Sequence, residues 1–130
     1  MATIFTKIIE REIPAQIVAE DDKHIAFLDI NPLVEGHTLV VPKAEVDYIY
    51  DMADEDYLAL QAFAKKVAKA VKAGIPCLRV GVAVIGLEVP HTHIHLVPLN
   101  KMDDINFSRK KLNPSAAELA AAADKIREKM

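Results

Sequence analysis

The sequence has little of what builds disulfide-rich, nucleic-acid-binding or membrane proteins. Cys77 is the only cysteine, so the chain can form neither an internal disulfide nor a cluster of thiolate metal ligands. The formal net charge is −3 and the lysines are scattered, whereas a nucleic-acid-binding domain needs a basic face. No apolar run approaches the roughly 20 residues that span a bilayer. We therefore expect no nucleic-acid partner and no membrane association.

The first residues, MATIFTKIIEREIP, also lack the apolar stretch of a secretory signal peptide. They carry charges at Lys7, Glu10, Arg11 and Glu12 instead, which is unlike a signal sequence. The 130 residues are the length of one domain, and 52% of them are hydrophobic, which is enough to form a core. We expect one cytoplasmic domain that spans residues 1–130.

Hydrophobic periodicity predicts an α+β fold. A long helix is predicted over residues 54–72, because apolar residues recur there three or four positions apart. Shorter helices are expected over residues 4–10 and after Ser115, which forms the start of a capping box with Glu118. Alternating or apolar runs predict strands at residues 16–20, 24–29, 37–42 and 78–84, and at the histidine segment.

Three of the five histidines lie in the segment VPHTHIHLVP, residues 89–98. His91, His93 and His95 occupy every second position. Since successive side chains of a strand point to opposite faces, a strand here would place the three imidazoles on one face. The residues between them would face the core.

Three interpretations of this cluster compete. The first is a polar strand face without a role. The second is a metal site, because a His-x-His pair on a strand chelates zinc well. His91 and His95 would lie about 13 Å apart along a strand, so a pair would need another ligand such as His37 or Glu88. The third is chemistry on phosphorus, in which one imidazole attacks while its neighbours hold charged oxygens and manage the leaving-group proton.

The segment HTHIHLV resembles the signature of the histidine triad (HIT) family of nucleotide hydrolases and transferases, His-φ-His-φ-His-φ-φ, where φ is apolar. Only Thr92 departs from it. The segments FLDINP and GHTLVVPK are similar to the N-terminal half of the Hint branch, which includes purine nucleoside phosphoramidases. The resemblance covers residues 3–99, expected to form the domain core, with a C-terminal extension that carries a helix at about 115–128. It implies an antiparallel sheet of about five strands, one long helix and a C-terminal helix.

The resemblance also implies roles for individual residues. His93 matches the nucleophile that forms a covalent nucleotidyl-imidazole, His91 and His95 match its flanking partners, and His37 matches a fourth active-site histidine. Asp29 matches the carboxylate that binds the ribose hydroxyls, although a turn acceptor is the alternative. The other candidate substrate-binding residues are Phe5, Ile8, Ile13, Phe27, Ile30, Glu88 and Val89.

The sequence departs from the family at several positions. Some members bind structural zinc through a Cys-x-x-Cys near the N-terminus, where this chain has Thr3 and Thr6, so we expect no such zinc site. Glu45 stands where many Hint proteins have a histidine. Leu87 and Glu88 stand where a glutamine and a serine usually precede the triad, and Glu88 either protonates an amine leaving group or caps the loop.

The expected function is hydrolysis of nucleoside 5′-monophosphate esters or phosphoramidates through a nucleotidyl-histidine, without metal or cofactor. The alternatives are a dinucleoside polyphosphate hydrolase, a nucleotide-binding regulatory protein and a metalloenzyme built on strand histidines. The resemblance also implies a homodimer, and the helix over residues 54–72 is consistent with this because it has more apolar surface than one stripe needs. The small residues Gly81 and Ala83 would permit close approach to a second subunit.

Overall fold

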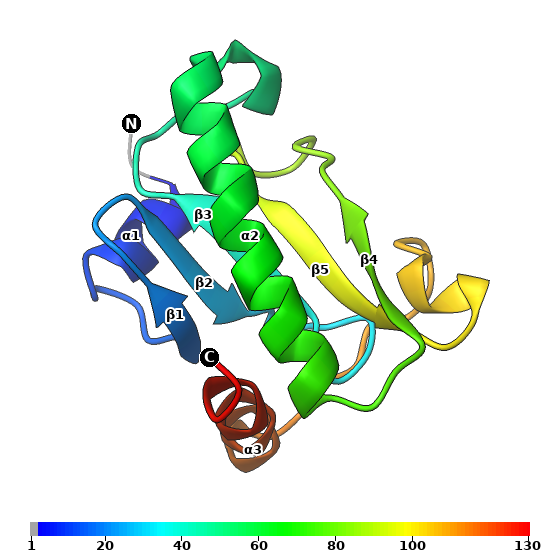
Figure 1. Ribbon diagram of the computed structural model, residues 1–130. Coiled ribbons are helices and arrows are strands. Elements are labelled where there is room, and N and C mark those ends of the chain that lie inside the picture. Colours follow the sequence, from blue (N-terminus) through cyan, green and yellow to red (C-terminus); the bar gives the residue numbers. More distant parts are fainter. Residues whose placement is uncertain (1–2) are drawn as a thin grey trace.

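The computed structural model describes residues 3–130, in which five antiparallel strands form one sheet with helices packed against it (Figure 1). The strands are β1 (Ile17–Glu20), β2 (His24–Leu28), β3 (Thr38–Pro42), β4 (Arg79–Ala83) and β5 (Ile94–Leu99), in the order β1-β2-β3-β5-β4. The helices are α1 (Ile4–Ile9), α2 (Asp54–Gly74) and α3 (Ala116–Arg127), with short 3₁₀ turns η1 (Ile49–Asp51) and η2 (Met102–Ile105). The predicted fold class is confirmed.

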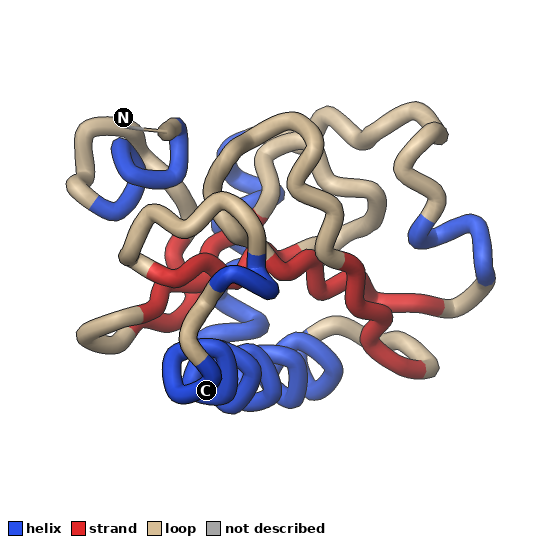
Figure 2. Tube along the Cα trace, turned by 90° about the horizontal axis from the view of Figure 1, so that it is seen from above, coloured by secondary structure: helices blue, strands red, loops and turns tan. Residues whose placement is uncertain are grey.

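Both faces of the central strands are covered. In β2, Ala26 and Leu28 join the core under α2 and α3, while Ile25 and Phe27 pack on the opposite face with residues of α1. This alternation follows from the period of two along a strand. Figure 2 shows α2 and α3 on one side of the sheet, and the loops and short helices on the other. None of the described helices is long and apolar enough to cross a membrane.

The stripe predicted along α2 faces the sheet. Leu60, Ala64, Val67 and Val71 are buried, and Tyr57 at the start of the stripe is partly buried. Acidic residues fill the first turn of α2, where the helix dipole favours negative charge. The capping box of α3 is also formed as predicted, with Ser115 and Glu118 each accepting a backbone N–H from the other.

The helix α2 ends at Gly74, two residues beyond its predicted end. A Cβ atom at Gly74 would lie 2.4 Å from the carbonyl oxygen of Lys125 in α3. Glycine is therefore needed here because the backbones of two helices approach closely.

The strand predicted through all three histidines is wrong at its start, because β5 begins at Ile94. Thr92, two residues earlier, uses both its backbone N–H and its hydroxyl to donate to the carbonyl of Val46, at 2.7 and 2.6 Å. The pairing of β3 with β5 ends at Val40 and Ile94. The segment before Ile94 is thus held by a loop and not by a neighbouring strand.

Gly81 in β4 does not leave room for a second subunit. A Cβ atom there would lie 2.5 Å from the side chain of Leu99 and 3.1 Å from that of Ile105. This small residue therefore serves packing within the chain. The opposite face of β4 is more open, since Val82 and Val84 are 59% and 40% exposed.

Replacing Gly74 by alanine tests the close approach of α2 and α3. Helix propensity alone would make this change stabilising by about 1 kcal/mol. The contact with Lys125 predicts the opposite sign, a loss of about 1–3 kcal/mol in the free energy of unfolding, measured by urea denaturation. A variant as stable as the parent or more so would show that the helices do not constrain this position.

Candidate active site

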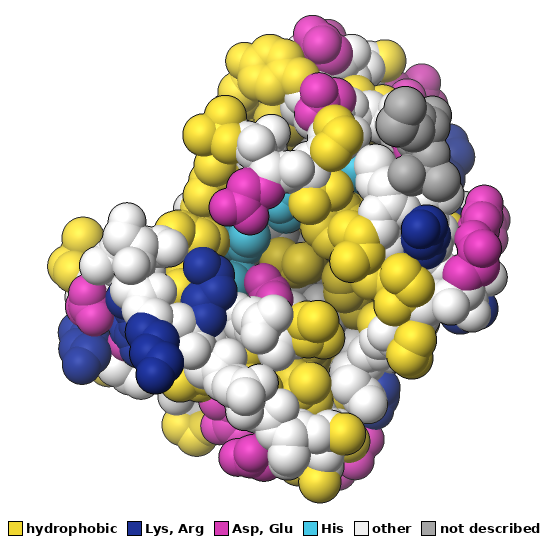
Figure 3. Space-filling view, turned by 180° about the vertical axis from the view of Figure 1, so that it is seen from behind, with side chains coloured by type: hydrophobic (Ala, Val, Ile, Leu, Met, Phe, Trp, Pro, Cys, Tyr) yellow, Lys and Arg dark blue, Asp and Glu magenta, His cyan; other side chains and the backbone are white. Residues whose placement is uncertain are grey.

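A cavity of about 430 Å³ lies on the face of the sheet opposite α2. Figure 3 shows histidine side chains at the bottom of a hollow on this face, with apolar side chains beside them. All residues predicted for the site from the sequence, except His91, line this cavity. The nominated residues that line it are Phe5, Ile8, Ile13, Phe27, Asp29, Ile30, His37, Glu88, Val89, His93 and His95.

His93 is held by the backbone in one tautomer. Its Nδ1 lies 2.8 Å from the carbonyl oxygen of His91. A carbonyl can only accept, so Nδ1 carries the hydrogen and donates it. The neutral ring then has a bare Nε2 with a free electron pair. His93 lines the cavity, so the site holds a nitrogen nucleophile.

His91 lies behind the cavity and not in it. The residue is fully buried, its Nε2 donates to the carbonyl oxygen of Pro42 at 2.7 Å, and its Nδ1 accepts from the hydroxyl of Thr3 at 3.0 Å. Both ring nitrogens are therefore occupied within the protein. Its ring lies on the same side of the sheet as that of His93, since both rings pack against Phe5, with centroids 5.9 and 4.8 Å from it. The carbonyl of His91 accepts the hydrogen bond from His93.

The two N-terminal threonines connect α1 to His91. Thr3 is the N-cap of α1 and accepts the backbone N–H of Thr6 at 3.2 Å, while the hydroxyl of Thr6 donates to the carboxylate of Glu45. These threonines stand where zinc-binding relatives are expected to have cysteines. In this chain the hydroxyl of Thr3 links α1, the helix that contains Phe5, to His91, the first histidine of the triad.

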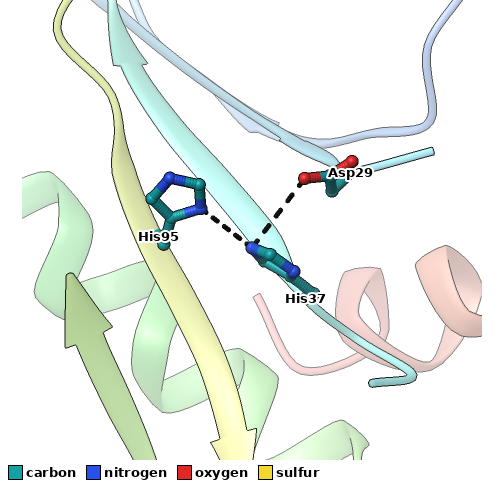
Figure 4. A group of neighbouring side chains, drawn as sticks. All are labelled: Asp29, His37 and His95. Atoms are coloured by element: carbon teal, nitrogen blue, oxygen red, sulfur yellow. Dashed lines mark hydrogen bonds and ion pairs between the residues drawn. The ribbon is translucent and has the colours of Figure 1, made fainter. Parts of the chain in front are cut away.

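His37 and His95 form a second pair with defined tautomers (Figure 4). The backbone N–H of Leu33 donates to Nδ1 of His37 at 3.1 Å, so the hydrogen of neutral His37 lies on Nε2. That Nε2 donates to Nδ1 of His95 at 2.9 Å. His95 must then carry its own hydrogen on Nε2. The cavity thus contains a bare nitrogen on His93 and an N–H on His95, with ring centroids 5.0 Å apart.

Asp29 follows β2 directly and lines the cavity beside this pair. Its Oδ1 accepts the backbone N–H of Asn31 at 2.9 Å, so the turn role considered from the sequence is present. Its Oδ2 lies 3.9 Å from Nε2 of His37. The carboxylate is therefore oriented by its own turn, with one oxygen on the side of the histidines.

Burial keeps the site histidines neutral. Loss of solvent lowers the pKa of His93 below its ordinary value, although the hydrogen bond to His91 opposes the shift. The pKa of His95 falls to about 3, first because of burial and then because of the nearby charges of His37, His93 and Lys111. Burial likewise lowers the pKa of His37. A neutral His93 is the form that can attack an electrophile.

Asp29, His37 and His95 are also the described residues that come closest to a metal site. One ligand atom from each lies within 4.8 Å of the others, and zinc accepts histidine and carboxylate ligands. A metal bound by all three would have to replace the hydrogen bond between His37 and His95. This set differs from the His-x-His pair that the sequence suggested.

Among the lining residues that were not predicted from the sequence, two lie in the C-terminal part of the chain. Phe107 and Lys111 come from the segment after η2 and line the cavity. The ring of Phe107 packs edge-on against His95, with centroids 4.8 Å apart. This segment has no hydrophobic period and no matched motif, so its position at the cavity could not be predicted.

The HIT domain model matches residues 10–102. The chain belongs to the histidine triad family. It is 42% identical over 118 residues to an uncharacterized HIT-like protein of Borreliella burgdorferi, covering 85% of each chain. It is 40% identical over 98 residues to an adenosine 5′-monophosphoramidase of Saccharomyces cerevisiae, covering 75% of this chain and 62% of that protein.

Solved structures of the family share the fold. A HIT-like protein from Bartonella henselae, described as involved in cell-cycle regulation, superposes with a TM-score of 0.85 at 33% identity, covering 98% of this chain and 96% of the other. The histidine triad fold expected from the sequence, with its five strands, long helix and C-terminal helix, is confirmed.

The lowered histidine pKa values predict acid sensitivity. Unfolded imidazoles take up protons below about pH 6.5, whereas buried His95 does not until about pH 3. The unfolded state then binds more protons, so the free energy of unfolding should fall between pH 6.5 and 5, by up to about 1.4 kcal/mol per pH unit for each such histidine. In a His95→Gln variant the free energy of unfolding should fall less steeply with decreasing pH, by up to about 1.4 kcal/mol per pH unit. Urea denaturation at both pH values measures it, and equal slopes would contradict the buried neutral His95.

Proposed function

We propose that this histidine triad protein hydrolyses nucleoside 5′-monophosphate derivatives, phosphoramidates above all, through a nucleotidyl intermediate on His93. The observation that carries the proposal is the hydrogen bond from Nδ1 of His93 to the carbonyl of His91, which leaves Nε2 bare at the cavity. The similarity to adenosine 5′-monophosphoramidases at 40% and 34% identity supports the choice of substrate class.

The first step forms a bond between Nε2 of His93 and phosphorus and breaks the bond from phosphorus to the leaving nitrogen. The departing amine takes a proton, from water or from Glu88 at the cavity rim. The ring of His93 becomes positively charged, and the carbonyl of His91 stabilises it through Nδ1–H. The N–H of His95 is placed to donate to a phosphoryl oxygen, where it would oppose the growing negative charge.

In the second step, water hydrolyses the nucleotidyl-histidine intermediate. Water attacks phosphorus, the bond to Nε2 breaks with its electron pair returning to His93, and the proton of the water passes to solvent. The product is a nucleoside 5′-monophosphate. No step requires a metal ion, because the imidazoles supply both the nucleophile and a hydrogen-bond donor.

The remaining cavity residues suit a nucleoside. Phe5, Ile8 and Phe27 are buried apolar residues that line the cavity, and a purine base would pack against them. Asp29 lies beside His37, with Oδ2 3.9 Å from Nε2, and its carboxylate would accept hydrogen bonds from ribose hydroxyls. Such bonds to a charged group are worth about 1.5–3 kcal/mol. Ile30 is 59% exposed, so it would only border the base at the rim.

His93→Ala tests the nucleophile. Its kcat/KM for adenosine phosphoramidate should fall by at least about a thousandfold, because loss of a covalent nucleophile removes most of the catalysis, while AMP binding is retained. Parent activity should survive exhaustive chelation.

A panel with guanosine phosphoramidate and diadenosine polyphosphates distinguishes the alternatives. Polyphosphates as the best substrates would favour a dinucleoside polyphosphate hydrolase, and tight binding with no turnover would favour a regulatory protein. Activity lost on chelation and restored by one metal would favour the Asp29, His37 and His95 site as a metal centre.

We also propose that the protein is a two-fold symmetric homodimer that uses α2 and β4. Leu58 on α2 is 64% exposed, and Leu78 and Val82 at β4 are 73% and 59% exposed. Since β4 is an edge strand, the same apolar patch on two copies could meet as an isologous interface. Sedimentation equilibrium at micromolar concentration should give twice the chain mass, and Val82→Glu should shift the protein to monomer. A parent protein that sediments as a monomer would refute this interface.

A further inference from the structure

The segment of residues 106–112, NFSRKKL, lines the cavity through Phe107 and Lys111 and is held by contacts along its length. At its start the backbone N–H of Asn106 donates to the carbonyl of Asp103 at 3.1 Å, and in its middle the guanidinium of Arg109 donates to the same carbonyl at 2.9 Å and lies 3.4 Å from the carboxylate of Asp104. At its end, the backbone N–H of Leu112 donates to the carbonyl of Pro32 at 2.9 Å. The 106–112 segment is therefore part of the site wall.

Phe107 places this segment against the histidines. Its ring packs edge-on against His95 at 4.8 Å and against His37 at 6.2 Å, measured between centroids. On the other side, Phe5 packs edge-on against His93 at 4.8 Å. The catalytic histidines thus lie between two phenylalanines, one on the side of the apolar base wall and one on the side of the 106–112 segment.

Lys111 supplies the positive charge at this end of the cavity. Among the lining residues in the described part of the chain it is the only lysine or arginine, whereas Asp29 and Glu88 are acidic. Its Nζ lies 3.5 Å from the carbonyl oxygen of Phe107, a long contact that does not neutralise it. Lys111 lowers the pKa of both His37 and His95, which agrees with its position beside Phe107, the residue that packs against both rings.

The rings of Phe5, His93, His95 and Phe107 follow one another along the cavity, with successive centroids 4.8, 5.0 and 4.8 Å apart. If the base packs against Phe5 and phosphorus lies beside His93, the group beyond phosphorus can extend past His95 toward Phe107 and Lys111. We propose that Lys111, positioned by Phe107, recognises a negatively charged leaving group, a carboxylate or phosphate on the moiety joined to the nucleoside monophosphate. This inference rests on the proposed function and specifies its substrate class.

The test uses a pair of ligands that differ in one charge, the adenosine 5′-phosphoramidates of glycine and of glycinamide. Their affinities are measured by calorimetry for the His93→Ala variant, which holds the ligand without cleaving it. An exposed ion pair contributes up to about 1 kcal/mol, so the glycine compound should bind up to about fivefold more tightly. Adding Lys111→Met should abolish this preference, and adding Lys111→Arg should retain it.

Lys110→Met is the matched control, because Lys110 is the neighbouring lysine of the same segment and does not line the cavity. It should leave the preference unchanged. Equal binding of the two ligands before Lys111 is changed would overturn the proposal. Equal weakening of both ligands by Lys111→Met would overturn it too, because Lys111 would then bind the common phosphoryl oxygens.

The same pair of compounds, given to the parent protein, separates this inference from the proposed function. Charge-dependent binding without turnover would refute the hydrolase and leave the role of Lys111 standing. Turnover without charge discrimination would refute the role of Lys111 alone.

Discussion

The hydrogen bond between Nδ1 of His93 and the carbonyl of His91 determines what the site can do. It selects the tautomer whose Nε2 is bare, and a bare imidazole nitrogen is the nucleophile that the proposed reaction needs. The carbonyl itself is held in place because the ring of His91 is fixed at both nitrogens, by Pro42 and by Thr3. The first histidine of the triad is thus a support for the second, and α1 is tied to that support through its N-cap.

The neutral state of the site histidines limits how the site can bind an anionic substrate. Burial lowers the pKa of the site imidazoles, which preserves the nucleophile and also removes the positive charge that an anionic substrate would otherwise meet. The hydrogen on Nε2 of His95, fixed by the chain from Leu33 through His37, replaces part of that charge with a directed donor. The full charge comes from Lys111, outside the triad.

Much of this could be predicted from the sequence. The stripe on α2 and the capping box of α3 are local patterns, and the structure has both. The start of β5, the need for glycine at position 74 and the burial of His91 could not be predicted. Each depends on a contact with a distant segment, at Val46, Lys125 and Thr3 respectively. Phe107 and Lys111 were missed because a segment without periodicity carries no sign of where it packs.

The tautomers of the three histidines at the cavity are the most direct test of this arrangement. Two-bond ¹H–¹⁵N correlation spectra of the uniformly labelled protein at pH 7 distinguish protonated from bare ring nitrogens. We expect His93 to be neutral with its hydrogen on Nδ1, and His37 and His95 to be neutral with theirs on Nε2. A His93 ring that is doubly protonated, or that carries its hydrogen on Nε2, would contradict the proposed nucleophile.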